Sequence, residues 1–228
     1  MTDAGSALPI VLLSLKVALI GTLLSLPIAL VTALALARGR FWGRSLLNVL
    51  VHLPLVLPPV VTGYLLLRLF GRRGPIGAFL EDTLGLTLAF RWTGAAVAAA
   101  VMGFPLMVRA MRLAIEAVDH ELEEAAASLG APPAWTFVTV TLPLALPGLV
   151  AGMVLAFAKA LGEFGATITF VSNIPGETQT LALAIYSFVQ APGGDAAAMR
   201  LVWWSIGLSC AALVASEMLS RKMERRRR

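Results

Sequence analysis

Long apolar runs separated by short polar segments dominate the hydrophobic pattern of this sequence. A membrane-spanning helix needs roughly 20 mainly apolar residues. Five segments reach or approach that length, and they predict an all-α polytopic membrane protein with about five transmembrane helices: Ile10–Ala37, Leu46–Phe70, Gly94–Met111, Leu144–Leu161 and Leu201–Leu219.

Two shorter apolar runs, Gly165–Val171 and Leu181–Val189, are too short to span a membrane alone. They form either a re-entrant or interfacial hairpin around residues 173–176 or a sixth short span, and we favour five spans. The first apolar run is too long for the core of a signal peptide and has no basic segment before it. We therefore expect an uncleaved first span.

The distribution of Lys and Arg predicts the orientation, because cytoplasmic segments carry an excess of both. If the N-terminus is outside, eleven lie at cytoplasmic ends: Arg38, Arg40, Arg44, Arg109, Arg112, Arg221, Lys222 and Arg225 to Arg228. Five lie on the other side: Arg68, Arg72, Arg73, Arg91 and Arg200. The predicted topology is N-out and C-in.

Composition supports the membrane class and argues against nucleic acid as a partner. Hydrophobic residues make up 58% of the 228, whereas soluble domains contain about 45–50%. The net charge of +5 alone would be compatible with a nucleic-acid-binding protein. However, the basic residues flank apolar spans and form no basic face with interleaved aromatic residues, so the expected surrounding is the lipid bilayer.

The longest polar interruption, Glu124–Pro143, lies between the third and fourth predicted spans. Its pattern predicts a short helix, a stop, a second short helix and a return to the membrane. Asp119 is a suitable N-cap, Gly130 suits the position after the helix end, and Pro132 and Pro133 end one helix and open the next. Residues at helical spacing form one apolar face: Leu122, Ala125, Ala126 and Leu129. From these features alone, the segment is either an ordinary cytoplasmic loop or a docking element.

The spacing in this segment resembles the EAA loop of bacterial ABC-importer permeases. The residues that carry the resemblance are Glu124, Ala125, Ala126, Gly130, Val140, Leu142 and Pro143. It implies a type I ABC importer membrane domain, a single domain over residues 1–228 of a bacterial inner-membrane protein. It also implies that coupling helices at about residues 114–143 dock into a cleft on a separate ATPase subunit, and that this chain is not itself catalytic.

Three further stretches resemble the permease for molybdate rather than those for sugars, amino acids or peptides. They are HLPLVLPPVVTGYLLL at 52–67, FPLMVRAMRLAIEAVD at 104–119 and LGEFGATITFVSNIPGETQT at 161–180. With the EAA loop, the resemblance covers the chain from about Ile10 to Leu219. It implies molybdate, or tungstate, as the transported substrate, with sulfate and thiosulfate permeases as the related alternative.

The second predicted span contains three prolines within residues 54–59. Proline removes a helix donor and clashes with the preceding turn, so this span must break or kink. Broken membrane helices are tolerated where the freed backbone is buried in protein or lines a wet cavity. Pro58 and Pro59 therefore mark either a packing kink or a segment that lines the translocation pathway.

Ionisable side chains occur where the fourth span ends. Lys159 and Glu163 are i, i+4 neighbours that neutralise each other in one interpretation. In the other, Lys159 offers a weak, transient site for a passing anion. Gly165 permits close backbone approach there, and hydroxyls are available from Thr167 and Thr169. Both interpretations stay open.

Motif absences define the expected partners. The sequence has no G-x4-GK[ST] P-loop and no His/Cys cluster with metal-ligand spacing. We expect this chain to bind no cofactor or metal, and the resemblance implies that ATP and Mg²⁺ are used by the partner ATPase. So few spans do not enclose a path comfortably, which predicts a C2 homodimer with the path on its axis. Two ATPase subunits inside and a molybdate-binding protein outside complete the implied assembly, which works by alternating access.

Two rival functions belong to other classes. A secondary transporter driven by an ion gradient needs intramembrane acid or base relays, and the acidic loop would have no role in it. A pure membrane scaffold leaves the EAA pattern unexplained.

Overall fold

The computed structural model describes residues 7–225, and every element in that range is a helix. In chain order these are α1 (Ala7–Arg38), α2 (Arg44–Val56), α3 (Pro59–Phe70), α4 (Pro75–Leu84), α5 (Trp92–Glu116), α6 (His120–Ser128), α7 (Pro133–Thr136), the π-helix η2 (Phe137–Thr141), α8 (Leu142–Leu161), α9 (Gly165–Val171), α10 (Leu181–Gln190) and α11 (Asp195–Arg225). Arg226 to Arg228 of the charge count lie outside the described residues.

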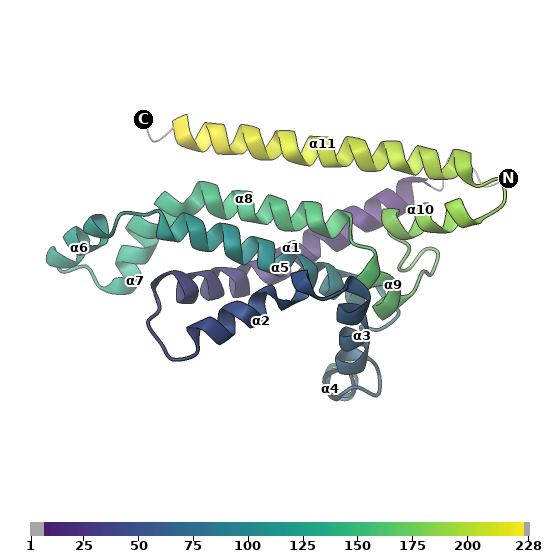
Figure 1. Cartoon of the computed structure of the whole chain (residues 1–228), viewed down its shortest axis with the longest axis horizontal. Coiled ribbons are helices and arrows are strands. Elements are labelled where there is room, and N and C mark those ends of the chain that lie inside the picture. The colour runs from purple at the N-terminus through teal and green to yellow at the C-terminus, as the bar shows by residue number, and fades with distance from the viewer. Residues whose placement is uncertain (1–6, 226–228) are drawn as a thin grey trace.

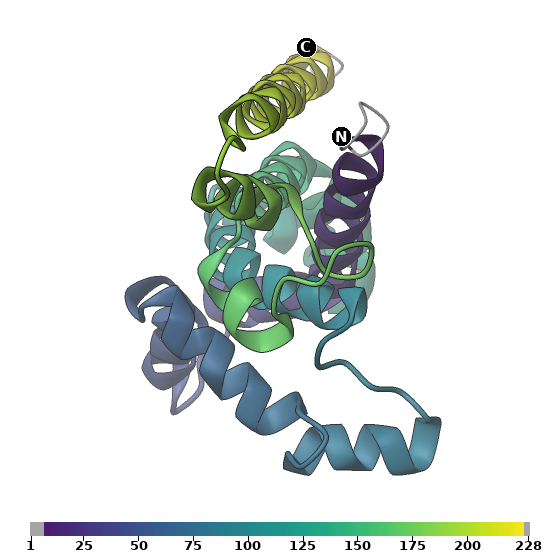
Figure 2. The same ribbon diagram turned by 90° about the vertical axis from the view of Figure 1, so that its right-hand side faces the viewer.

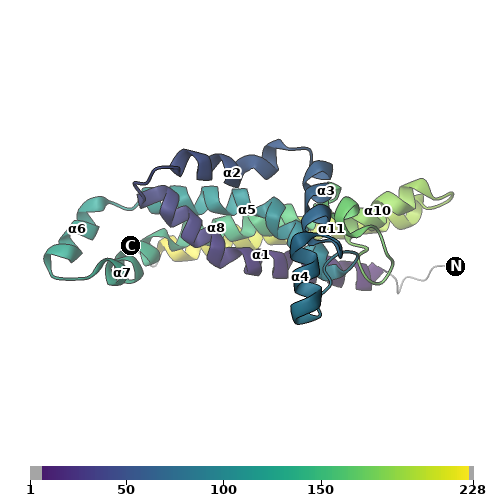
Figure 3. The ribbon, with the colours of Figure 1, turned by 90° about the horizontal axis from the view of Figure 1, so that it is seen from below.

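The long helices α1, α5 and α8 pack side by side and form the body of the bundle (Figure 1). Helix α11 lies along α8 on one side, and α2 lies against α5 on another (Figures 1 and 3). The short helices α6 and α7 stand at one end of the bundle, whereas α9 and α10 stand at the other (Figure 1). Figure 2 shows that α3 and α4 project away from the body.

Successive crossings alternate in direction, as the predicted topology requires. Helices α1, α5 and α11 run toward the end that carries α6 and α7, and α2 and α8 run away from it (Figure 1). Within residues 7–225, four helices are long and apolar enough to cross a membrane: Ala7–Arg38, Trp92–Glu116, Pro133–Leu161 and Asp195–Ala215. Counting the bent pair α2–α3 as one span brings the number to five.

Small residues allow the three central helices to approach closely. A Cβ atom on Gly21 of α1 would lie only 2.7 Å from the Ala96 carbonyl oxygen of α5. Similarly, a Cβ atom on Gly152 of α8 would lie 3.1 Å from the Ala110 side chain of α5. Membrane helices associate through such small residues, because lipid tails compete equally well for larger apolar side chains.

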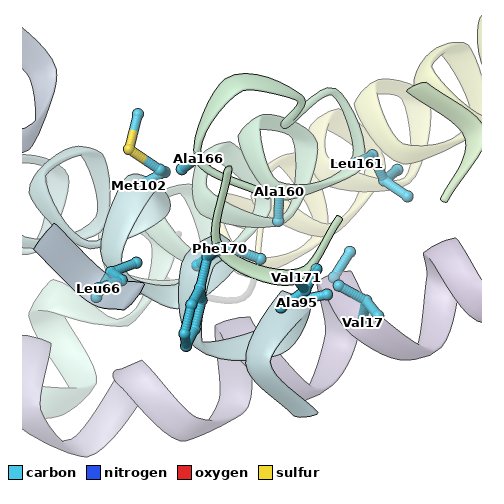
Figure 4. Packing of buried hydrophobic residues seen from close by; sticks show 12 residues of the cluster. Val17, Leu66, Ala95, Met102, Ala160, Leu161, Ala166, Phe170 and Val171 are labelled. Atoms are coloured by element: carbon cyan, nitrogen blue, oxygen red, sulfur yellow. The ribbon is translucent and has the colours of Figure 1, made fainter. Parts of the chain in front are cut away.

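The core at the outer end of the bundle is built around Phe170 of α9, which is fully buried. Side chains from α1, α3, α5 and α8 surround it, among them Val17, Leu66, Ala95, Met102, Ala160 and Leu161 (Figure 4). The Phe70 and Phe170 ring centroids are 6.4 Å apart, an arrangement that favours edge contacts between aromatic rings. At the same end, the Lys16 ammonium lies 3.5 Å from the centroid of the Trp92 ring. This cation–π contact joins α1 to the start of α5.

The predicted break in the second span is confirmed, but the segment is not one straight crossing. Helix α2 ends at Val56, α3 begins at Pro59, and the two axes are bent by 112°. The reason is the proline pair, since Pro58 is the N-cap and Pro59 the first residue of α3. Helix α3 therefore leaves the line of the bundle (Figure 1).

The hairpin interpretation holds for the segment after the fourth span. Helices α9 and α10 are 7 and 10 residues long, so neither crosses a bilayer. The chain between them is fixed by Thr178, whose hydroxyl accepts from the Ile174 N–H at 2.8 Å and donates to the Ser172 carbonyl at 3.0 Å. In the described residues this segment therefore forms a short helical hairpin at the outer end, not a sixth span.

Candidate functional site

Helix α6 forms as the sequence predicts. Its N-cap is Asp119, whose carboxylate accepts a hydrogen bond from the Glu121 N–H at 3.0 Å. Glu121 and Glu123 add negative charge to the first turn, where the helix dipole favours it. The cap and the first-turn charges start a nine-residue helix that is too polar to form by apolar burial.

Gly130 ends α6 in the left-handed conformation, with φ of +86°. The Gly130 N–H donates to the Ala127 carbonyl at 2.9 Å, and the Ala131 N–H donates to the Ala126 carbonyl at 3.1 Å. This pair of bonds is a Schellman motif, which favours glycine at its left-handed position. Pro133 then occupies the first turn of α7, so the predicted helix–stop–helix pattern is confirmed.

The chain returns to the bundle through a π-helix, where a second short α-helix was predicted to lead directly into the membrane span. Residues Phe137–Thr141 adopt this form, and the Thr139 hydroxyl donates to the Trp135 carbonyl at 2.7 Å. Four consecutive β-branched residues occur here, and such residues fit poorly in a regular α-helix. Single π-turns inside helices are frequent at functional sites. Val140 lies half-buried within this turn, followed by half-buried Leu142 and exposed Pro143.

Glu123 ties the loop to the rest of the chain. Its Oε1 atom lies 3.2 Å from Nη2 of Arg38 at the end of α1, and it accepts from the Thr141 hydroxyl at 2.6 Å. The guanidinium of Arg38 also donates to the Val118 carbonyl at 3.0 Å and to Nε2 of His120 at 2.6 Å. Because Nε2 accepts, Nδ1 carries the ring proton, and Nδ1 lies 3.4 Å from Glu123 Oε2.

Arg38, Glu123 and Thr141 line a cavity of about 420 Å³ between α6 and the bundle. Glu123 and Arg38 retain only 20% and 18% of their side-chain exposure. Screening by water is therefore reduced, and the pair is stronger than an exposed ion pair. The polar cluster sets how α6 stands relative to α1 and to the start of α8.

Glu124, the adjacent residue, takes no part in this polar cluster. It is exposed and forms no hydrogen bond or ion pair within the described part of the chain. Ala125 is exposed beside it, and Ala126 is half-buried. Large apolar side chains around them are exposed as well: Leu122, Leu129, Trp135 and Val138. With Leu129 88% and Trp135 61% exposed, the outer face of the loop has the composition of a docking surface.

A second group of predicted residues lies at the other end of the bundle, where α3 packs on α9. A Cβ atom on Gly165 would lie 2.7 Å from the Pro59 side chain, and one on Gly63 would lie 2.8 Å from the Thr169 side chain. The structure thus brings Pro59, Gly165 and Thr169 together. Pro58 and Pro59 are exposed at the break, whereas Thr167 is 2% exposed and lies inside the packing.

Lys159 and Glu163 form the predicted i, i+4 ion pair. The Lys159 side chain retains 30% exposure, and the Glu163 side chain retains 2%. The second carboxylate oxygen of Glu163 accepts from the Ala166 N–H at 3.0 Å, at the start of α9. The pair therefore joins the end of α8 to α9, and the i, i+4 contact expected from the spacing is present.

Comparison with known proteins identifies the family. Residues 21–224 match the family described as binding-protein-dependent transport system inner membrane component. The chain belongs to this family. It is 59% identical to the molybdenum transport system permease protein ModB of Escherichia coli K12, over 92% of both chains. Identity to ModB of Haemophilus influenzae is 55%, over 94% of this chain and 93% of that one.

The chain is also similar, at lower sequence identity, to a sulfate permease and to solved transporter structures. Identity to the sulfate transport system permease protein CysT of Salmonella typhimurium is 40%, over 71% of this chain and 58% of that one. The fold is similar to that of a bacterial ABC transporter involved in the import of the acidic polysaccharide alginate, with a TM-score of 0.74. That alignment covers 96% of this chain and 80% of that chain at 15% identity. The fold is therefore that of a type I ABC importer membrane domain.

The residue that holds the loop to the bundle was not among those that the EAA spacing selects. The EAA spacing selects Glu124, but the contacts that hold the loop are made by Glu123 with Arg38 and Thr141. Arg38 and Glu123 are 85 positions apart. A contact between residues so far apart leaves no periodic pattern in the sequence. The only signal for it was that the predicted topology places both residues on the cytoplasmic side of the membrane.

Proposed function

We propose that this chain is the permease subunit of an ATP-driven importer that moves molybdate, or the related tungstate, across the inner membrane. High identity to two ModB proteins over most of the chain supports molybdate. The lower identity and coverage with CysT argue against sulfate as the main substrate. Family membership also supports the view that the subunit itself is not catalytic.

The coupling role rests on the loop. Residues 119–143 present exposed Glu124 and an exposed apolar face at the end of the bundle that the charge distribution assigns to the cytoplasm. A surface of this kind suits a cleft in a soluble partner. We infer that α6 and α7 dock on the separate ATPase through Glu124, Ala125, Ala126 and Gly130, with Val140, Leu142 and Pro143 continuing the motif into the membrane.

The homodimer rests on the break between α2 and α3. Irregular backbone within a membrane is tolerated only in protein or beside water, yet Pro58 and Pro59 are exposed in the single chain. Val60, Val61 and Tyr64 continue this exposed face along α3. We infer that a second copy covers it, with the path for the anion on the two-fold axis.

The path segment then contains Pro58, Pro59, Gly165 and Thr169, with Lys159 and Glu163 beside it; buried Thr167 supports α9 from within. An external binding protein delivers the anion, and the ATPase pair drives the change between outward- and inward-facing states.

Reconstitution tests the proposal. Vesicles that contain the permease with its ATPase and binding protein should take up labelled molybdate only with ATP. Uptake that persists without the ATPase and ATP would overturn the importer assignment in favour of a gradient-driven transporter. Excess sulfate should compete weakly, and competition equal to that of unlabelled molybdate would overturn the substrate assignment.

A further inference from the structure

A second polar cluster lies between α2 and α5, away from both the loop and the α3–α9 contact. The cluster lies at a cavity of about 320 Å³ that is lined by Asn48, His52, Arg109, Arg112, Leu113 and Glu116. Charged residues in the membrane part of a helix are rare and default to a functional role. The contacts of each residue show which of them are free to bind a ligand.

Arg112 is held by two side chains that line the cavity. Its Nε donates to Glu116 Oε1 at 2.8 Å, and its Nη1 donates to Asn48 Oδ1 at 3.2 Å. The same Glu116 oxygen lies 3.8 Å from Nη2 of Arg44. One carboxylate is thus shared by two guanidinium groups, which fixes the wall of the cavity.

Arg109 differs from Arg112 in its contacts. It is exposed within the cavity, and it forms no hydrogen bond or ion pair with any residue that the structure describes. It precedes the end of α5 by seven residues, which is about 10 Å along the helix. Because Asn48 Oδ1 accepts from Arg112, the Asn48 amide N–H groups remain available as further donors.

The charge of the cluster matches a doubly charged anion. Arg44, Arg109 and Arg112 oppose the single carboxylate of Glu116, which leaves two positive charges in excess. Arginine remains protonated at any physiological pH, and its planar fork suits tetrahedral oxyanions. The cavity lies toward the end of the bundle that carries α6, which is the cytoplasmic end.

We propose that this cavity binds a tetrahedral oxyanion, with Arg109 as its direct ligand and Asn48 as a second donor. The inference deepens the proposed function, since an imported molybdate must leave at this end. An anionic phospholipid also presents a tetrahedral oxyanion, its singly charged phosphodiester, so the experiment needs one arm for each source.

The test uses the intact permease–ATPase complex without nucleotide. In the first arm, equilibrium dialysis against tungstate followed by elemental analysis gives the affinity of the complex in phosphatidylcholine nanodiscs. In the second arm, native mass spectrometry measures retention of phosphatidylglycerol. Arg109→Gln should weaken binding about tenfold or more in one arm, which identifies the source. Arg109→Lys, which keeps the charge, should retain part of the binding.

Arg40→Gln is the matched control, because Arg40 is an exposed arginine at the same end with no contact to the cavity. It should leave both arms unchanged. Wild-type binding by Arg109→Gln in both arms, or an equal loss with Arg40→Gln, would overturn the inference. Molybdate uptake by the wild-type complex is measured in parallel. Loss of that uptake would contradict the proposed function, whereas normal uptake with unchanged binding by Arg109→Gln would contradict only this site.

Discussion

Arg38 at the inner end of α1 and Glu123 in α6 form an ion pair of 3.2 Å, although 85 positions separate them in the sequence. The neighbouring Glu124 makes no such contact and is exposed. In our proposal the two adjacent carboxylates therefore have different roles. Glu123 fixes α6 to α1 and α8, and Glu124 is presented to the ATPase. A force on the outer face of α6 would be transmitted to the bundle through Glu123.

Glu123→Ala should loosen α6 in the permease without its ATPase. The change removes the acceptor for Arg38 and Thr141, and hydrogen bonds to charged groups contribute about 1.5–3 kcal/mol. If α6 opens locally, deuterium exchange of residues 120–128 should accelerate about tenfold or more. Hydrogen-exchange mass spectrometry measures this rate.

Glu124→Ala is the matched control for that experiment. It should leave exchange in the free permease unchanged and weaken co-purification with the ATPase. Equal exchange rates in the two variants would contradict the division of roles between the adjacent carboxylates.

Gly130 should tolerate Asn better than Val. A Cβ atom there meets nothing within 4 Å, but φ is +86°, and an L-residue in this region costs about 1–2 kcal/mol. Asn adopts the conformation more readily. We expect Gly130→Val to insert in the membrane but to lose ATPase binding in pull-down assays, and Gly130→Asn to bind nearly normally.

Gly207→Val controls for added bulk at Gly130, since a Cβ atom at Gly207 also meets nothing within 4 Å and the backbone there has no positive φ. If Gly130→Val co-purifies with the ATPase and transports like the wild type, the docking hypothesis is wrong.

Local features of this fold could be predicted because each depends on a few consecutive residues. The N-cap at Asp119, the left-handed turn at Gly130 and the break at Pro58 follow from steric and hydrogen-bonding preferences of those residue types. The size of the bend, 112°, and the Arg38 contact were not predictable in this way, because they depend on how distant helices pack. The π-turn at Phe137–Thr141 falls on a run of β-branched residues, but such a run only lowers helix propensity and does not specify a π-helix.

Gly63→Ala should disturb the contact between α3 and α9. The added Cβ would lie 2.5 Å from the Ala166 carbonyl oxygen, and overpacking of this kind costs about 1–3 kcal/mol. We expect a lower melting temperature and slower molybdate uptake, measured on the purified complex and in vesicles. Gly207→Ala, at a position with open space, should change neither. Wild-type uptake by Gly63→Ala would show that the path does not depend on this contact.

Lys159→Ala should both destabilise the permease and slow anion passage, and a second variant separates the two effects. The single change leaves the Glu163 carboxylate, 2% exposed, without its cation, and breaking a buried pair costs about 3–5 kcal/mol. In Lys159→Ala/Glu163→Gln no charge is stranded, and the amide oxygen still accepts from the Ala166 N–H. Thermal unfolding of the double variant should therefore return toward that of the wild type. If Lys159 also serves the passing anion, molybdate uptake by the stable double variant stays low. Full recovery of uptake together with stability would limit Lys159 to pairing with Glu163.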